Sequence, residues 1–392
     1  MSASDIKRFL IIGAGRQGCA VAAFLLEQFD NTAIDFVDCS ADQLSQAVKL
    51  QKDASRVATH ELGVSPVGDA LKTLMSDAAC VVSCVPYRFN LELTQASVAV
   101  GTAFCDLGGN VGTVAAQLEL DAACKSANIA IAPDCGLAPG LLNILAEYWS
   151  AEWDYKSVRL YCGGLPQNPK GVMNYALTFN VCGLLNEYLD DCEVSRGGKL
   201  EVIPGMSEPE RLNDLALPGE FEAFATSGGT SRGAKDYAAK GVDYIYKTIR
   251  HPGHRDVIVA MWEMGFFDTK ASSHISANES HELVPWDVSG SIMEMNMPSD
   301  GQDLVVARAA VEGTKDGAPV KGEINLIDYA VDRFTAMERT TGFPTAIVAA
   351  ALAGMYEKQP VEPGARVPFQ FMDPKLVIDE LVRSGINGIS IR

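Results

Sequence analysis

The sequence has no long hydrophobic run and no excess of positive charge. Its 392 residues contain no stretch of about twenty consecutive apolar residues, the length of a membrane-spanning helix. Lys and Arg number 32 against 50 Asp and Glu, a formal net charge of −18. Nucleic acids and anionic membrane surfaces bind basic patches, so this charge argues against both kinds of partner. The N-terminus contains Asp5, Lys7 and Arg8 instead of a signal-peptide core, and we therefore expect a soluble, cytoplasmic protein.

Cysteine and histidine lack the spacing that metal sites need. The 10 cysteines stand singly between Cys19 and Cys192 without a C-x-x-C pair, and several, such as Cys80 and Cys84, lie in apolar runs. We interpret them as buried, reduced thiols. The 5 histidines show no H-E-x-x-H spacing. We therefore expect no metal.

A glycine-rich turn lies near the start of the chain. The apolar run that begins at Phe9 leads directly into Gly13, Gly15 and Gly18, and apolar residues at helical spacing follow. Gly13 would permit the tight turn, Gly15 the approach of a pyrophosphate, and Gly18 the close packing of helix on sheet. A helix starting near Arg16 would point its unpaired amides at the phosphates. The pattern predicts a dinucleotide-binding turn.

An acidic residue follows at the distance expected for a ribose contact. A second predicted strand, residues 33–37 (AIDFV), ends on Asp38, about 20 residues after the last glycine. A carboxylate there would bind the ribose 2′-hydroxyl of NAD and repel the 2′-phosphate of NADP. We predict NAD as the cofactor, although Arg16 could still receive a phosphate.

Beyond Asp38 the chain alternates between helical and strand-like segments. Further strands are predicted at residues 56–59, 79–84, 103–106 and 129–132. With the two strands already described, they predict an α/β fold with a Rossmann-type, doubly wound parallel sheet. Ligands of such sheets sit beyond the carboxyl ends of the strands. The loops at residues 85–90, 106–110 and 133–140 are therefore candidate site loops.

The middle of the chain has a different pattern. Strand-like runs separated by turn residues occur at 158–162, 175–179, 200–203, 244–249, 304–312 and 320–327. They predict a second α+β domain with a mixed, mostly antiparallel sheet.

The last segment returns to helix. An apolar helix is predicted at residues 344–355, with Pro344 near its first turn, and an amphipathic helix at 374–384 precedes a strand at 388–391. We expect this tail to pack on the first domain. The predicted division is a dinucleotide-binding domain of residues 1–133, completed by residues 344–392, and a substrate-binding and oligomerisation domain of residues 134–343.

Five segments resemble one known family. They are residues 106–109 (DLGG), 133–141 (PDCGLAPGL), 224–231 (FATSGGTS), 246–254 (YKTIRHPGH) and 339–347 (RTTGFPTAI). Together they resemble the saccharopine dehydrogenase-like family, and within it the lysine 6-dehydrogenase branch. The resemblance implies NAD-linked chemistry at an amino-acid side-chain nitrogen, and a homo-oligomer such as a homodimer. The loop at residues 85–87 is closer to the saccharopine reductases, a departure that bears on the substrate.

An amine dehydrogenase needs a cation for the substrate carboxylate and a group that takes a proton from the reacting ammonium. We predict Arg250 as the carboxylate anchor, on its forked geometry and on the resemblance. The candidates for proton transfer are Asp106, Asp134, Lys247 and His254. Lys247 and Arg250 are three apart on a predicted strand, so they should point to opposite faces. Asp106 could instead bond its own glycine loop, and Asp134 could cap the helix that follows.

The remaining candidates surround these groups. Glu187 and Asp190 are interpreted as a solvated turn. Further substrate contacts are predicted at Tyr87, Asn174, Tyr175 and Asn180. The predicted cofactor-binding residues are Gly13, Gly15, Arg16, Gln17, Gly18, Asp38, Cys39, Cys84, Val85, Pro86, Leu107, Gly108 and Gly109.

Three functions compete at this point. The first is NAD-dependent oxidative deamination of L-lysine at its 6-position to the semialdehyde. The second is a saccharopine dehydrogenase or reductase, whose substrate has a second dicarboxylate arm; Arg159 and Arg232 could supply the extra cations. The third is a non-catalytic NAD-binding sensor, which would need the glycine motif but no basic strand near the nicotinamide.

Overall fold

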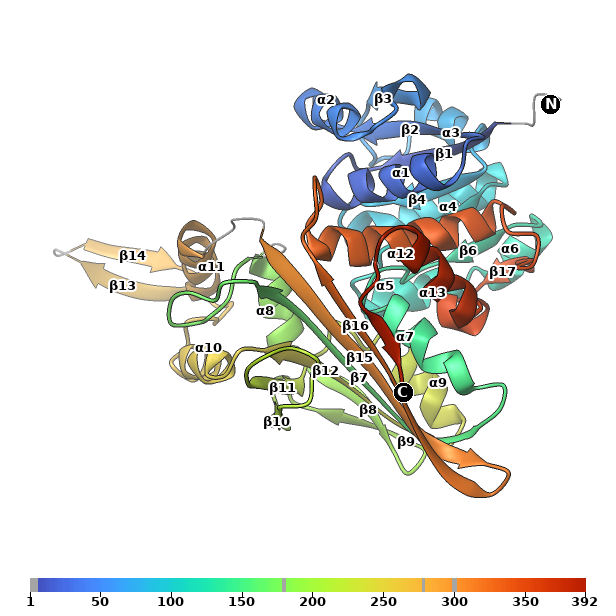
Figure 1. Cartoon of the computed structure of the whole chain (residues 1–392). Coiled ribbons are helices and arrows are strands. Elements are labelled where there is room, and N and C mark those ends of the chain that lie inside the picture. Colours follow the sequence, from blue (N-terminus) through green and yellow to red (C-terminus); the bar gives the residue numbers. More distant parts are fainter. Residues whose placement is uncertain (1–5, 178–180, 277–278, 298–301) are drawn as a thin grey trace.

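The protein contains two large β-sheets, each with its own helices. The computed structural model describes residues 6–177, 181–276, 279–297 and 302–392. Figure 1 shows a sheet enclosed by helices beside a long twisted sheet, with a two-stranded hairpin projecting at the far end of the second region. In the described part of the chain, no helix is long and apolar enough to cross a membrane.

The first sheet is parallel and doubly wound, which confirms the predicted fold class. Its described strands follow the order β17-β6-β5-β4-β1-β2-β3. The four residues of β4 are all buried, as expected for a parallel sheet covered on both faces. The strands are β1 (Lys7–Ile12), β2 (Thr32–Asp38), β3 (Val57–Glu61), β4 (Cys80–Ser83), β5 (Ala103–Asp106), β6 (Ala130–Ala132) and β17 (Gly364–Ala365). The helices between them are α1 (Arg16–Gln28), α2 (Ala41–Leu50), α3 (Asp69–Ser76), α4 (Asn90–Val100), α5 (Val111–Leu118) and α6 (Asp121–Ser126).

The second sheet is mixed and mostly antiparallel, also as predicted. Its described strands follow the order β10-β11-β12-β7-β15-β16-β18, and β8 pairs with both β12 and β9. Strands β12 and β7 are parallel, whereas the other described neighbours are antiparallel. The strands are β7 (Asp154–Pro166), β8 (Cys192–Arg196), β9 (Lys199–Ile203), β10 (Glu210–Leu212), β11 (Phe221–Ala225), β12 (Asp243–Arg250), β15 (Asp303–Lys315), β16 (Ala318–Tyr329) and β18 (Ile389–Ile391).

Several helices of the second region were not predicted from the sequence. The strand expected at 175–179 is not formed at the described residues 175–177, and a helix begins at Val181. Glu187 therefore lies in a helix and not in a turn. The helices of this region are α7 (Leu141–Ala146), α8 (Val181–Leu189), α9 (Gly233–Ala239), α10 (His254–Glu263) and α11 (Pro285–Asn296), and the projecting hairpin is β13 (Ser272–Ser276) with β14 (Glu279–Leu283).

The C-terminal segment joins both sheets, which corrects two expectations. Helix α12 (Ala336–Leu352) begins well before Pro344, which lies inside it, because Thr335 and Glu338 form a capping box at its start. Strand β17 pairs with β6 of the first sheet, but β18 pairs with β16 of the second. Residues 344–392 thus do not complete the first domain alone. The remaining helix of this tail is α13 (Pro374–Arg383).

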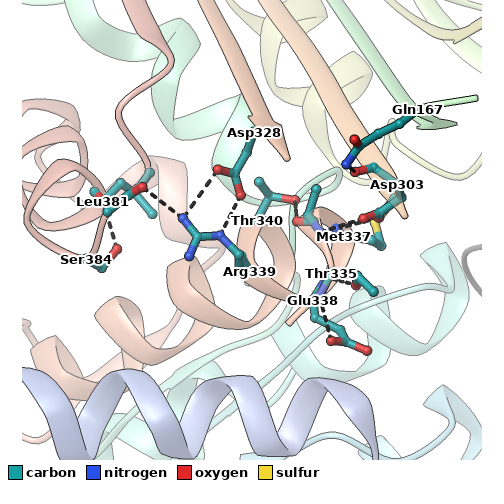
Figure 2. A network of polar contacts seen from close by, with 12 residues as sticks. Gln167, Asp303, Asp328, Thr335, Met337, Glu338, Arg339, Thr340, Leu381 and Ser384 are labelled. Carbon is teal, nitrogen blue, oxygen red and sulfur yellow. Dashed lines mark hydrogen bonds and ion pairs between the residues drawn. The ribbon is translucent and has the colours of Figure 1, made fainter. Parts of the chain in front are cut away.

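Acidic residues of the second sheet fix the start of α12. Figure 2 shows Asp303 of β15 beside the first turn of the helix, where its carboxylate accepts hydrogen bonds from the amides of Ala336 (2.7 Å) and Met337 (2.9 Å). A carboxylate at a helix N-terminus satisfies unpaired amides and complements the helix dipole. One turn later, Arg339 forms a buried ion pair with Asp328 of β16, with 2.8 Å between Nε and Oδ2. The second sheet therefore sets the position of a helix that packs on α1 of the first domain.

Candidate active site between the two sheets

The three glycines of the motif have three different environments. A Cβ atom at Gly18 would lie 2.0 Å from the carbonyl oxygen of Gly13, and one at Gly13 would lie 2.8 Å from that of Cys84. Both positions therefore exclude a side chain. A Cβ atom at Gly15 would have nothing within 4 Å. The space beside Gly15 is open, as required where a pyrophosphate approaches the backbone.

The helix that follows offers unpaired amides at this opening. Helix α1 begins at Arg16, and its N-cap, Gly15, provides no side-chain cap. Unpaired N–H groups together with the positive end of the helix dipole favour an anion here. The Arg16 side chain is largely exposed and lies 3.7 Å from Glu338.

Asp38 ends β2 next to this turn. Its carboxylate accepts hydrogen bonds from the amides of Ala14 and Ser40, both at 2.9 Å. These two bonds hold the carboxylate at the edge where the ribose of a dinucleotide would lie. Cys39, the next residue, is exposed.

A cavity of about 850 Å³ lies where the first sheet faces the second. Gln17 of the glycine-rich turn and the loops after β4, β5 and β6 form one side, β7, β12, α8 and the loop after β11 form the other, and Met337 and Thr341 of α12 also contribute. Of the predicted residues it is lined by Gln17, Cys84, Val85, Pro86, Tyr87, Leu107, Gly109 and Arg250. The predicted residues Asp106, Asp134, Asn174, Tyr175, Lys247 and His254 lie outside its lining, and Asn180 lies outside the described residues.

Asp106 and Asp134 lie beneath the loop after β5, which contains Gly108 and the cavity-lining Gly109. Asp106 accepts hydrogen bonds from the Gly108 amide (2.7 Å) and from Gln117 Nε2 (2.6 Å). Burial raises the pKa of Asp106 to about 6. Asp134 accepts a hydrogen bond from the Ser231 hydroxyl, and burial together with the charge of Asp106 raises its pKa well above the usual value. The alternative that Asp106 binds its own loop matches this geometry, whereas α7 is capped without Asp134.

Arg250 ends β12 and is almost completely buried at the cavity wall. Its guanidinium stacks over the rings of Tyr175 (5.0 Å) and Tyr188 (5.4 Å). Nε donates to the Tyr188 hydroxyl at 2.6 Å and Nη1 to the carbonyl of Ile249 at 2.9 Å. Among the described residues, its hydrogen bonds thus all go to uncharged oxygens. A buried cation without a carboxylate partner is costly, and an anion in the cavity would complete its pairing.

His254 lies behind this arginine and not in the cavity. Its Nδ1 lies 3.0 Å from the carbonyl oxygen of Met173, and its Nε2 lies 3.0 Å from the Tyr188 hydroxyl. Burial and the charge of Arg250 lower the pKa of His254 to about 3. The neutral ring therefore donates from Nδ1 to Met173 and accepts at Nε2 from Tyr188, which in turn accepts from Arg250. A chain of hydrogen bonds thus runs from Arg250 through Tyr188 and His254 to the backbone of Met173.

Lys247 is placed on the opposite face of β12, as the strand alternation predicted. It donates to the carbonyl of Glu208 (2.8 Å) and pairs with Glu210 (2.8 Å). This geometry removes Lys247 from the candidates for proton transfer, because side chains of one strand alternate between faces. Tyr246 and Arg250, on the other face, both line the cavity.

Helix α8 contributes polar residues that sequence reasoning assigned to a turn. Val181, Leu184, Leu185 and Tyr188 form its buried face. Glu187 and Asp190, on and just beyond its other face, line the cavity. The helical spacing of the four apolar residues was the signal that could have located this helix.

Matches to known proteins agree with this arrangement of two domains, one with the parallel sheet and one with the mixed sheet, on either side of the cavity. Residues 9–131 match the saccharopine dehydrogenase NADP binding domain, and residues 136–386 match the saccharopine dehydrogenase C-terminal domain. The chain therefore belongs to the saccharopine dehydrogenase family.

Individual relatives are distant. The NADP(+)-dependent, L-glutamate-forming saccharopine dehydrogenase of Schizosaccharomyces pombe is 24% identical over 270 residues, which are 66% of this chain and 59% of that protein. The corresponding enzyme of Pyricularia oryzae is 23% identical over 60% of this chain and 53% of its own length. The chain thus matches little more than half the length of these relatives. The apo saccharopine dehydrogenase (L-Glu forming) of Saccharomyces cerevisiae has the same fold, with a TM-score of 0.75 at 18% identity over 98% of this chain and 99% of that one.

Proposed function

We propose that the protein is a dehydrogenase that oxidises the carbon–nitrogen bond of an amino-acid side chain with a nicotinamide cofactor. Membership of the saccharopine dehydrogenase family supports the reaction class. The open space at Gly15 and the uncapped start of α1 fit the pyrophosphate of a dinucleotide. When bound, the cofactor accepts a hydride from the carbon that carries the amine.

We propose NAD as that cofactor. The support is Asp38, whose carboxylate is held by two backbone amides at the end of β2. A fixed negative charge at this place repels the 2′-phosphate of NADP. The relatives from S. pombe and P. oryzae are named for NADP.

The observation that carries the proposed function is the environment of Arg250. An almost completely buried guanidinium, fixed by two tyrosines, faces a cavity whose other side is formed by Gln17 of the glycine-rich turn and by the loops after β4, β5 and β6. A substrate carboxylate can complete its pairing with two parallel hydrogen bonds. The role of Arg250 is to fix one end of the substrate so that the carbon to be oxidised lies on the cofactor side.

L-Lysine suits this cavity better than saccharopine. A second dicarboxylate arm would require further cations, but Arg159 and Arg232 do not line the cavity. Arg232 instead pairs with Asp236 at 2.9 Å. Saccharopine remains the second candidate, because Arg88 does line the cavity and the S. pombe and P. oryzae relatives are named for that substrate.

Proton transfer is proposed for the aspartate pair. Asp134 lies directly beneath the glycine loop, since a Cβ atom at Gly108 would lie 2.0 Å from its Oδ1, and Gly109 lines the cavity. The raised pKa of Asp106, about 6, suits a group that exchanges protons near neutral pH.

The test is turnover by the purified protein with L-lysine or L-saccharopine, each supplied with NAD or NADP, followed through the absorbance of the reduced nicotinamide. Turnover with lysine and NAD is expected. Turnover with saccharopine alone would replace the substrate, and a preference for NADP would replace the cofactor. Binding of NADH without turnover of either amino acid would support the sensor.

A further inference from the structure

Glu187 presents a carboxylate that is held in place from two sides of the cavity wall. Its Oε1 accepts a hydrogen bond from the hydroxyl of Thr248 (2.6 Å), and the Thr226 hydroxyl, 3.3 Å from the same oxygen, lies 2.7 Å from the Thr248 hydroxyl, to which it can donate. The backbone carbonyl of Glu187 accepts a further bond from the amide of Ser227 (3.0 Å). Two strands of the second sheet, β11 through its end and β12, thus orient one side chain of α8.

The glycines of the loop after β11 make this arrangement possible. A Cβ atom at Gly228 would lie 2.8 Å from Cγ of Glu187, and one at Gly229 would lie 2.1 Å from Cζ of Tyr246. Any side chain at either position would displace a cavity-lining residue. The loop therefore serves as a close-fitting support for Glu187 and Tyr246, which gives the segment of residues 226–230 a structural role at the substrate side.

Glu187 and Arg250 share the same face of the wall without pairing. Thr248, which holds Glu187, precedes Arg250 by two residues on β12, so both point to the cavity side of the strand. Burial alone would lower the pKa of Arg250, but the adjacent Tyr188, Tyr175 and Glu187 outweigh it and raise that pKa. No direct ion pair joins Glu187 to Arg250 in the described residues; each has its own fixed hydrogen-bond partners.

We propose that Glu187 and Arg250 together bind the zwitterionic head group of an L-α-amino acid, with the α-ammonium at Glu187 and the α-carboxylate at Arg250. A neighbouring cation and anion that are held apart match a ligand with the opposite charges on adjacent atoms. This inference rests on the proposed function, since it places the side-chain end of the substrate on the cofactor side. It makes Glu187 the residue that discriminates α-amino acids from simple carboxylic acids.

The test uses ligands that cannot react. L-Norleucine has the head group and chain length of lysine without the side-chain nitrogen, and hexanoate lacks the α-ammonium as well. We would titrate both, and D-norleucine, into the full-length protein saturated with NADH and measure their Kd values by calorimetry. Wild-type protein is expected to bind L-norleucine at least tenfold more tightly than hexanoate or D-norleucine, about the contribution of one charge-assisted hydrogen bond.

Two variants isolate the role of Glu187. In Glu187→Gln the preference for L-norleucine over hexanoate should fall to about twofold or less while the Kd of hexanoate stays unchanged. Asp190→Asn, which removes a negative charge from the same cavity, should retain the preference. Thr248→Val keeps the carboxylate of Glu187 but removes the 2.6 Å hydrogen bond that orients it. It should weaken the binding of L-norleucine more than that of hexanoate. Thermal unfolding and NADH affinity establish that each variant is folded.

The outcomes separate this inference from the proposed function. Equal binding of L-norleucine and hexanoate by wild-type protein, or an equal loss of both ligands in Glu187→Gln, overturns the head-group assignment whether or not lysine is oxidised. If wild-type protein prefers L-norleucine to hexanoate and Glu187→Gln loses this preference, the head-group assignment is upheld. This holds even if turnover shows saccharopine to be the substrate, because saccharopine carries the same head group. A loss in Asp190→Asn as large as in Glu187→Gln overturns it in favour of a general charge effect.

Discussion

The glycine-rich turn of residues 13–18, here called the cofactor loop, differs from the substrate wall, the side of the cavity formed by β12 and α8. The residues that contact each other are close in sequence in the cofactor loop and far apart in sequence in the substrate wall. In the cofactor loop, Gly13 and Gly18 contact each other within a single turn. In the substrate wall, Thr248 and Glu187 bond across 61 positions. A site made of neighbours in sequence can be recognised from spacing alone, whereas a site made across a fold depends on which faces two separate elements present.

The largest effect is expected from breaking the cofactor loop itself. Gly18→Ala places a methyl group 2.0 Å from a backbone oxygen and should cost at least about 3 kcal/mol in the free energy of unfolding. Gly15→Ala meets nothing within 4 Å, so its stability should match that of the wild type while NADH binding weakens by about tenfold, because the methyl group fills the pyrophosphate space. Thermal unfolding and NADH fluorescence titration measure the two effects. Unchanged NADH affinity in Gly15→Ala would falsify the assigned pyrophosphate position.

In the substrate wall, Arg250→Ala should weaken the binding of the amino acid and leave the binding of NADH unchanged, the reverse of a change in the cofactor loop. Loss of the buried cation that we propose as the partner of the substrate carboxylate should lower kcat/KM for the amino acid by about 100-fold, mainly through KM, with NADH affinity unchanged. Arg250→Lys keeps the charge without the fork and should recover part of the loss. Steady-state kinetics with varied amino acid measure both. A normal KM in Arg250→Ala would leave the carboxylate anchor unassigned.

The contrast between loop and wall also explains how much the sequence could predict. The parallel sheet and its glycine motif were predicted because each strand and turn is encoded locally, by an apolar run or by glycine spacing. The mixed sheet was predicted in outline for the same reason. Arg250 was predicted through its strand and through the family resemblance.

The features that the sequence did not predict depend on tertiary contacts or on weaker local signals. Helix α8 carries apolar residues at helical spacing, Val181, Leu184, Leu185 and Tyr188, yet the sequence around it was interpreted as strand and turn. Helix α12 begins at the capping box of Thr335 and Glu338, a signal that lies outside the apolar run used to locate the helix. That β18 joins the second sheet and that His254 stands behind Tyr188 follow from packing, which no local pattern encodes.

A smaller effect is expected at the ribose end of the cofactor loop. Asp38→Asn keeps one acceptor oxygen, so it retains one of the two hydrogen bonds that Oδ2 and Oδ1 accept from the amides of Ala14 and Ser40, and it removes the charge proposed to repel a 2′-phosphate. The ratio of kcat/KM with NADP to that with NAD should rise by about tenfold. Asp42→Asn, at the start of α2, is the matched control and should leave the ratio unchanged. If Asp38→Asn also leaves it unchanged, the nucleotide preference is set elsewhere, with Arg16 the first residue to examine.

The smallest effect concerns Asp134, which joins the two sides of the cavity through Ser231. Burial and the charge of Asp106 raise its pKa in the folded protein above the ordinary value of 3.8. Above that pH the unfolded chain releases the proton more readily than the folded one, so this group lowers stability as pH rises. Asp134→Asn does not titrate, and its melting temperature relative to the wild type should therefore increase from pH 4 to pH 8, by about 1 to 2 °C. In Ser231→Ala, which removes the hydrogen bond to Asp134, the melting temperature relative to the wild type should instead decrease from pH 4 to pH 8. A difference between Asp134→Asn and wild type that does not vary with pH would show that Asp134 is already ionised in the folded protein, and that the link between loop and wall is a charged one.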